Sequence, residues 1–249
     1  MSTRERATAP ADRYVVPAEA DVGAPVAFDE PIAEHHWRFD PANHDDIYLV
    51  GDVHGSVDQL KRLWDRLDPS GDDLVVFVGD LVRKGPASVK VTEFVAESPH
   101  AVSVRGNNET KLLRGTVNTA PFEPILETVA ELPLVISFGD TVVVHGGLHP
   151  EWAPAAHDPD DVLEMRSVPR GNGYDGPFWF EIYDGPPRVF FGHTVLEEPY
   201  VSDGAVGLDT GCVYGGNLTA YDWRTGELFS VPGTEHQSRP DRKFLDLEG

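Results

Sequence analysis

The chain has 249 residues, 40% of them hydrophobic, and contains no apolar run long enough to span a membrane. Its formal net charge of −22 disfavours nucleic-acid polymers and membranes as partners, because anionic surfaces would repel it at long range. A single cysteine, Cys212, excludes an internal disulfide, and no apolar segment follows the early arginines as in a secretory signal, so we expect a cytoplasmic location.

The charge is also distributed unevenly. Only five of the 20 basic residues are lysines, and aspartate is spread along the whole chain. Such a chain repels itself at low salt, whereas at molar salt the screening length falls to about 3 Å and the repulsion is largely screened. The composition resembles that of proteins from salt-accumulating halophiles; an ordinary acidic cytosolic protein is the alternative.

The first 45 residues are rich in Ala, Pro and acids and show no sustained period, which predicts a partly disordered N-terminal extension. Its histidines, His35, His36 and His44, are expected to face solvent. A domain is predicted over residues 46–232 and a polar tail over 233–249. Within the domain, short apolar runs that end at Gly, Asp, His or Asn predict strands at Ile47–Val50, Leu74–Val78, Ala101–Val104, Leu134–Phe138, Thr141–Val144, Arg188–Phe191 and Leu218–Tyr221.

Helices are predicted between the first strands. Ser56 and Gln59 form a capping-box pattern before apolar residues at helical spacing up to Leu67, and Pro86 is predicted to open a second helix. The order strand, helix, strand, helix, strand predicts an α/β fold with a parallel sheet, whose chemistry lies at the carboxyl ends of the strands. Gly139-Asp140 predicts a two-residue hairpin, after which the strands are expected to be more antiparallel.

Polar residues follow the predicted strands at their ends. Asp52 and His54 stand in "GDVHG", Asp80 in "GDLVRKGP" and Asn107 in "RGNNE". His145 in "VVVHGGL" and His193 in "FGHT" follow later strands in the same way. Because successive parallel strands end at one edge of a sheet, we expect these side chains to lie together.

This set of ligands suits divalent metal ions. Carboxylate and amide oxygens with imidazole nitrogens, and no thiolates, fit Mn, with Fe, Zn, Co or Ni as alternatives. Six ligands are too many for one ion with an open position, whereas a carboxylate that bridges two ions uses them all. Two-metal sites of this kind activate water for attack on phosphorus.

Together these motifs resemble the calcineurin-like metallophosphoesterases, in the branch of phosphoprotein phosphatases and symmetrical diadenosine tetraphosphatases. The resemblance covers Ile47 to Trp223, and Gly207–Trp223 looks like the closing hairpin of the tetraphosphatase-like members. It implies two mixed β-sheets packed face to face with flanking helices. It also implies a metal-dependent hydrolase that cleaves phosphate esters or anhydrides with a hydroxide activated by two metal ions.

The resemblance further implies roles for the six ligands. Asp52 and His54 would bind the first metal ion, and Asp80 would bridge both. Asn107, His145 and His193 would complete the second.

The second asparagine of "RGNNE" departs from the family pattern. Asn108 stands where the family has the histidine thought to protonate the leaving oxygen, and asparagine cannot donate a proton and recover it. Arg83 stands where the phosphoprotein phosphatases have the aspartate that orients this histidine. Lys84 replaces the arginine that grips phosphate, and so offers a point charge instead of a bidentate fork.

Three functions therefore remain open. The first is a hydrolase of phosphorylated small molecules or nucleotides whose leaving group needs no proton. The second is a hydrolase, such as a serine/threonine-type phosphoprotein phosphatase, with a substitute acid in His149 or a metal-bound water. The third is a metal-holding regulatory or binding protein that has lost catalysis. Of the cations in and between the motifs, Lys84 and then Arg166 are the candidates for phosphate binding.

Overall fold

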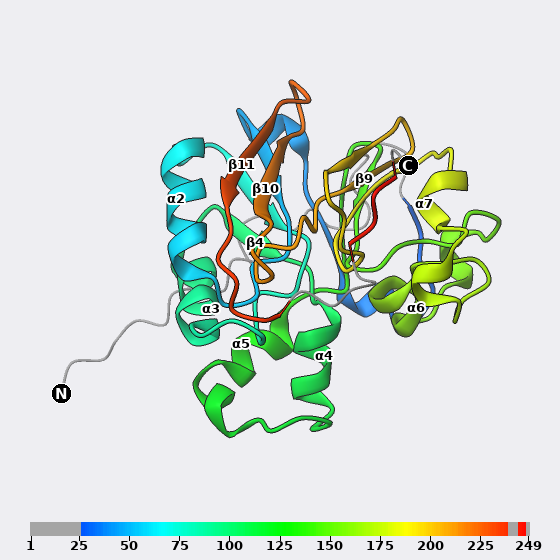
Figure 1. The fold of residues 1–249 in the computed structure, drawn as a ribbon. Coiled ribbons are helices and arrows are strands. Elements are labelled where there is room, and N and C mark those ends of the chain that lie inside the picture. Colours follow the sequence, from blue (N-terminus) through cyan, green and yellow to red (C-terminus); the bar gives the residue numbers. More distant parts are fainter. Residues whose placement is uncertain (1–25, 239–243, 248–249) are drawn as a thin grey trace.

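The computed structural model describes residues 26–238 and 244–247, which form two β-sheets packed between layers of helices (Figure 1). One sheet has five strands in the order β11 (Leu228–Pro232), β10 (Asn217–Asp222), β2 (Ile47–Val50), β3 (Leu74–Phe77) and β4 (Ala101–Ser103). The other has six, in the order β1 (His36–Arg38), β5 (Val135–Phe138), β6 (Thr141–Val143), β7 (Arg188–Phe191), β9 (Ala205–Gly207) and β8 (Tyr200–Val201). The two mixed sheets with flanking helices confirm the predicted fold class.

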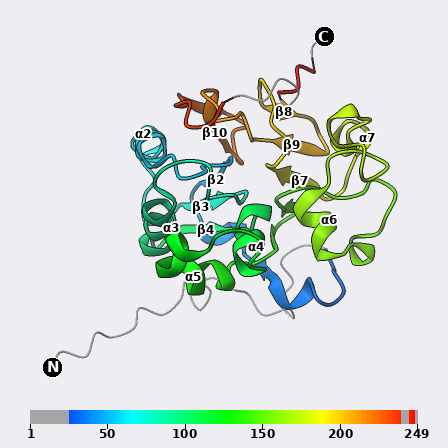
Figure 2. The ribbon, with the colours of Figure 1, turned by 60° about the horizontal axis from the view of Figure 1, so that its bottom comes forward.

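Helices lie on the outer sides of both sheets (Figures 1 and 2). The longest are α2 (Val57–Leu67) and α3 (Ser88–Glu97), which flank the five-stranded sheet. Shorter α-helices are α4 (Asn107–Leu113), α5 (Leu126–Glu131), α6 (Pro159–Glu164) and α7 (Trp179–Ile182), the last two beside the six-stranded sheet. Single 3₁₀ turns occur at Ala33–His35, Pro41–Asn43, Ala120–Ile125, Pro154–Ala156 and Gly173–Asp175.

Successive side chains of a strand point to opposite faces of its sheet, and in the buried strands both faces are covered, one by helices and the other by the second sheet. In β3, Val75 and Phe77 pack with the residues of α2 and α3, whereas Val76 on the other face packs with the opposite sheet. In β7, Phe190 points between the sheets, while Phe191 packs outward against Trp179 of α7. Because both faces of each strand are buried, these runs read as continuously apolar, as expected for central strands.

The topology brings the polar strand ends together. Strands β2, β3 and β4 are parallel, as predicted, and β5 and β6 form the predicted hairpin around Gly139-Asp140. The expectation that the later strands are antiparallel is wrong in part, because β6, β7 and β9 run parallel. Their carboxyl ends therefore also converge on one edge.

Residues 26–45, which were assigned to a partly disordered extension over residues 1–45, are part of the fold. This segment contributes β1, which pairs in parallel with β5, and it buries Ile32 and Phe39. His36 and His44 are buried instead of facing solvent, and burial followed by the charge of Arg38 lowers the pKa of His36 to about 3. The rest of the predicted extension, residues 1–25, lies outside the described residues.

Two smaller predictions also need correction. Helix α2 begins where expected, but the capping box is absent: Ser56 makes no capping hydrogen bond, and the Gln59 side chain donates to Thr234 Oγ1 over 2.6 Å. The second helix begins at Ser88, two residues after Pro86. In the predicted tail, Leu245 forms a bridge with Leu196, and Phe244 packs on Tyr214, so these residues belong to the fold. None of the helices formed by the described residues is both long and apolar enough to cross a bilayer.

Candidate active site

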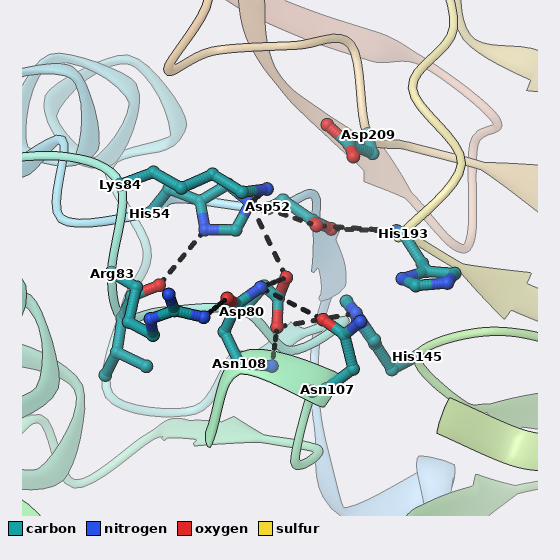
Figure 3. A network of polar contacts seen from close by, with 12 residues as sticks. Asp52, His54, Asp80, Arg83, Lys84, Asn107, Asn108, His145, His193 and Asp209 are labelled. Carbon is teal, nitrogen blue, oxygen red and sulfur yellow. Dashed lines mark hydrogen bonds and ion pairs between the residues drawn. The ribbon is translucent and has the colours of Figure 1, made fainter. Parts of the chain in front are cut away.

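The six predicted ligands surround a common space at the carboxyl ends of the strands (Figure 3). Each follows its strand within a few residues: Asp52 after β2, Asp80 after β3, Asn107 at the start of α4, His145 after β6 and His193 after β7. All six side chains, including His54, are at most 8% exposed. Both sheets thus contribute to one buried polar centre.

The backbone at this centre is strained. Six non-glycine residues of the described chain have positive φ, and five of them belong here: His54, Asp80, Arg83, Lys84 and His193. Left-handed conformations cost about 1–3 kcal/mol each in such residues and cluster at functional sites. The carboxylates also demand glycines nearby, since a Cβ on Gly106 would collide with Asp80 and one on Gly192 with Asp52.

Asp52, His54 and Asp80 form a compact group that could hold an ion, with ligand atoms all within 4.8 Å of one another. His54 Nε2 lies 3.7 Å from Asp52 Oδ2 and 3.5 Å from Asp80 Oδ2. On the other side of Asp80, His145 Nε2 lies 3.4 Å from Oδ1. Asp80 therefore stands between the two groups of ligands, as a bridging carboxylate must.

Backbone carbonyls set the tautomers of two histidines. His54 Nδ1 faces the Val82 carbonyl at 3.1 Å, and His145 Nδ1 faces the Val78 carbonyl at 2.8 Å. Each Nδ1 must therefore carry the proton and donate it, so Nε2 of the neutral ring carries the lone pair with which it would bind a metal ion. Consistent with this, Nε2 of His145 is buried without a hydrogen-bond partner.

Four carboxylates, those of Asp52, Asp80, Glu109 and Asp209, are buried together at this centre. Burial, and then the charges of Asp209 and Asp80, raise the pKa of Asp52 well above its ordinary value. Burial and then Asp80 also raise the pKa of Glu109 to about 7, and burial raises that of Asp209. Buried carboxylates pushed toward their neutral forms are what divalent cations would re-ionise, so the residues present fit a metal centre.

Asn108 is held in place by a cation. Arg83 Nη1 donates to Asn108 Oδ1 over 2.7 Å, so the amide must point its NH₂ the other way. This NH₂ donates to Asp80 Oδ2 over 2.5 Å and to Asn107 Oδ1 over 3.0 Å (Figure 3). Arg83 and Asn108, which replace the aspartate and histidine of the resembled family, thus remain a bonded pair with reversed polarity.

Basic side chains converge on a cavity of about 180 Å³ beside this pair. Its cationic lining consists of Arg83, Lys84, Lys111 and Arg166, and none of the ion pairs between described residues uses any of these four. In a chain of charge −22, four cations that form no ion pair with another described residue indicate a site for an anion. Arg166 also donates to the His193 carbonyl over 3.2 Å.

His149 does not line this cavity. Its ring stacks on Trp152 with centroids 4.1 Å apart, and its Nδ1 accepts from the Glu151 amide over 3.2 Å. The structure thus brings the six predicted ligands together with Lys84, Asn108 and Arg166, whereas His149, in the same loop as His145, lies outside the cavity lining.

Two acidic residues of the centre were missed by the sequence analysis. Asp209 follows the short strand β9 in "GLDTG", the same strand-end signal as for the other ligands, but β9 was not predicted. Glu109 is the acid that ends the motif "RGNNE", but no role was predicted for it. Its carboxylate accepts from the amides of Gly106, Asp80 and Val82 over 2.8 to 3.0 Å, and so it holds the loops that carry Asp80 and Asn107.

Comparison with known proteins agrees with this geometry. The model of the calcineurin-like phosphoesterase family matches residues 46–223. The symmetrical bis(5'-nucleosyl)-tetraphosphatase of Vibrio cholerae is 26% identical over 263 aligned positions, which cover 74% of this chain and 97% of the relative. The asymmetrical bis(5'-nucleosyl)-tetraphosphatase of Halalkalibacterium halodurans is 28% identical, with 81% and 98% covered. The relatives thus carry both the symmetrical and the asymmetrical name.

Solved structures show the same fold. A crystal structure of a candidate diadenosine tetraphosphatase superposes with a TM-score of 0.72 at 31% identity, and covers 81% of this chain and 99% of its own. A protein serine/threonine phosphatase from Saccharomyces cerevisiae reaches a TM-score of 0.56 at 14% identity, with 82% and 84% covered. The latter likeness concerns the fold alone.

Proposed function

Because the chain belongs to the calcineurin-like phosphoesterase family, we propose that it is a metal-dependent hydrolase of phosphoanhydrides, with nucleoside polyphosphates as its substrates. One observation carries this proposal: the buried Asp52, His54 and Asp80 group adjoins a cavity lined by four cations that form no ion pair with another described residue. The names of the bacterial relatives support the choice of substrate.

We assign the metal ligands as the strand ends suggest. Asp52 and His54 would hold a first divalent ion, and Asp80 would bridge it to a second. The second ion would be completed by Asn107, His145 and His193. Mn²⁺ is the favoured ion. When bound, such a pair of ions supplies an activated water and neutralises charge on the phosphoryl oxygens. The residues of the chain orient these ligands, exclude bulk water and bind the substrate.

The cations of the cavity would bind the phosphate chain. Arg83 and Lys111 lie on the side of Asn107 and Asn108, whereas Arg166 lies beside His193. Cations on both sides of the metal ligands suit an extended anion with several phosphate groups better than one phosphoryl group. Lys84 and Arg166 are the proposed contacts to the phosphoryl group under attack.

Asn108 explains the preference for anhydrides. Its NH₂ is fixed toward Asp80 and Asn107, and it has no proton to give to a departing alkoxide. A nucleotide phosphate instead leaves as a stable anion with a final pKa of about 6, for which acid assistance matters little. His149, apart from the cavity, is a weaker proposal for a substitute acid.

Two alternatives remain as proposals of lower rank. A phosphoprotein phosphatase would need a substitute acid, and His149, the candidate for it, does not line the cavity. A regulatory protein without catalysis would not need the retained ligand set and its strained backbone. The single cysteine, Cys212, is buried and unpaired, which supports a cytoplasmic location.

The experiment that tests the proposal compares diadenosine tetraphosphate, an aryl phosphate and a phosphoserine peptide after treatment with a chelator. We expect chelation to abolish hydrolysis of the first two and added Mn²⁺, Co²⁺ or Ni²⁺ to restore it. Full activity in the chelated protein would exclude the metal-dependent mechanism.

We also propose that the protein is adapted to high salt, on the basis of its charge of −22 and five lysines. Its melting temperature is expected to rise between dilute buffer and about 2 M KCl, because screening removes self-repulsion. Thermal unfolding followed by circular dichroism measures this rise. A melting temperature that stays constant or falls with salt would reject the adaptation.

A further inference from the structure

The ammonium of Lys84 contacts an atom that a metal ion needs. Lys84 Nζ lies 2.7 Å from His54 Nε2. Since His54 Nδ1 carries a proton toward the Val82 carbonyl, Nε2 has the lone pair and accepts from Lys84 (Figure 3). The ammonium is therefore bonded to the nitrogen with which His54 would bind the first metal ion.

The surroundings of this ammonium are those expected for a bound cation. Besides its contact with His54, Lys84 Nζ lies 5.4 Å from the centroid of the Tyr214 ring, a cation–π contact. Two successive left-handed residues, Arg83 at φ 66° and Lys84 at φ 59°, turn the loop so that these side chains face the centre. Such strain persists only where the surrounding structure imposes it.

We propose that Lys84 is an internal competitor of the first metal ion, which must displace the ammonium from His54 when it binds. This inference rests on the metal centre of the proposed function. Two cations cannot use one lone pair, and at so short a distance they repel each other. Arg166 contacts His193 Nδ1 at 3.2 Å in a similar way, but it also bonds to the His193 carbonyl, which gives its position a second cause.

The displaced ammonium remains near the substrate site. Lys84 itself lines the cavity, whereas Asp209, a buried carboxylate of the centre that is not among the proposed ligands, does not. An ammonium released from His54 is therefore available in the cavity to the substrate phosphate. Metal binding and formation of the phosphate contact are thereby coupled, so that the cavity is complete only when the ion is in place.

Replacing Lys84 by methionine tests the competition. We expect Lys84→Met to bind Mn²⁺ at its first site about tenfold more tightly or better, because one charged hydrogen bond no longer has to be broken. In chelator the same variant should melt about 4 °C or more below the wild type, because His54 Nε2 and the carboxylates lose their cation. Isothermal titration with Mn²⁺ and thermal unfolding in chelator give the two readouts.

Lys111→Met is the matched control. Lys111 lines the same cavity and carries the same charge, but it is not the residue bonded to His54. We expect Mn²⁺ affinity and melting temperature to change far less in this variant than in Lys84→Met. Equal effects in the two variants would assign the result to net charge and overturn the proposal, as would weaker or unchanged Mn²⁺ binding by Lys84→Met. If the wild type bound no Mn²⁺, the proposed function would fall together with this inference.

A crystal structure of the wild type with Mn²⁺ gives a test that does not depend on any variant. Lys84 Nζ should then lie beyond hydrogen-bond distance from His54 Nε2. An ammonium still bonded to His54 with the ion in place would overturn the proposal.

Discussion

Replacing Asp80 by asparagine is expected to lower kcat/KM for an aryl phosphate by at least about 100-fold. Losing a residue that only orients a metal ligand costs up to about 100-fold, and losing a bridging ligand should cost at least as much. This loss corresponds to about 2.7 kcal/mol of transition-state stabilisation. Asp80 is the carboxylate that lies near both His54 Nε2 and His145 Nε2, and it also accepts from the amide and side chain of Asn108. An amide at position 80 has one acceptor oxygen for these roles and would direct its NH₂ at another donor or at a metal ion.

The comparison with Asp52→Asn makes this prediction specific. Asp52 is proposed to hold only the first ion, so its loss should be less damaging than that of Asp80. Asp160→Asn serves as the control for removing a carboxylate, because Asp160 pairs with Arg114 on the surface, with 43% of its side chain exposed. Steady-state kinetics with saturating Mn²⁺ ranks the losses of kcat/KM in the three variants. An Asp80→Asn enzyme of near wild-type activity would refute the bridging role.

The parts of the centre that the sequence predicts are those with a local signal. Asp52, Asp80 and Asn107 follow strands whose apolar runs are long enough to recognise, and adjacent glycines mark the turns. Parallel strand order then places them at one edge without further information. Asp209 was missed because the residues of β9, Ala205-Val206-Gly207, include a single β-branched residue and do not form a distinctive apolar run.

The contacts between side chains could not be predicted in this way. Arg83 and Asn108 are 25 residues apart, and their hydrogen bond depends on the left-handed backbone of Arg83. The contact of Lys84 with His54 depends on the same turn. Likewise, β1 was missed because its three residues gain their stability from pairing with β5, almost 100 positions later, and not from a local pattern.

The reversed polarity of the Arg83–Asn108 pair predicts a substrate preference. The wild type should hydrolyse diadenosine tetraphosphate and aryl phosphates at least about 100-fold faster than phosphoserine peptides, because general acid assistance of a poor leaving group contributes about that factor or more. Rates measured in parallel with the three substrates at saturating Mn²⁺ test it. The physical reason is that the serine alkoxide must be protonated as it departs, whereas the nucleotide phosphate leaves as a weakly basic anion.

Restoring the acid requires both positions to change. With Asn108→His alone, the new imidazole would face the Arg83 guanidinium, which can only donate and would disfavour the protonated ring. Arg83→Asp supplies the orienting carboxylate, and aspartate tolerates the left-handed φ of 66° found at this position. We therefore expect the double variant to raise phosphoserine turnover about tenfold or more, with a much smaller change for the anhydride.

The matched control is Asn108→His with Arg83→Asn, which removes the guanidinium and keeps a residue that accepts left-handed φ but provides no negative charge. If orientation and stabilisation of the imidazolium matter, only the aspartate variant should gain selectively on phosphoserine. A bell-shaped pH profile of kcat should also appear in that variant alone, because it would titrate a new acid.

Should the wild type instead prefer phosphoserine peptides, with no selective change in either double variant, leaving-group chemistry would not account for Asn108. His149 would then become the acid to test, and its loop would have to move toward the cavity that it does not line in this structure.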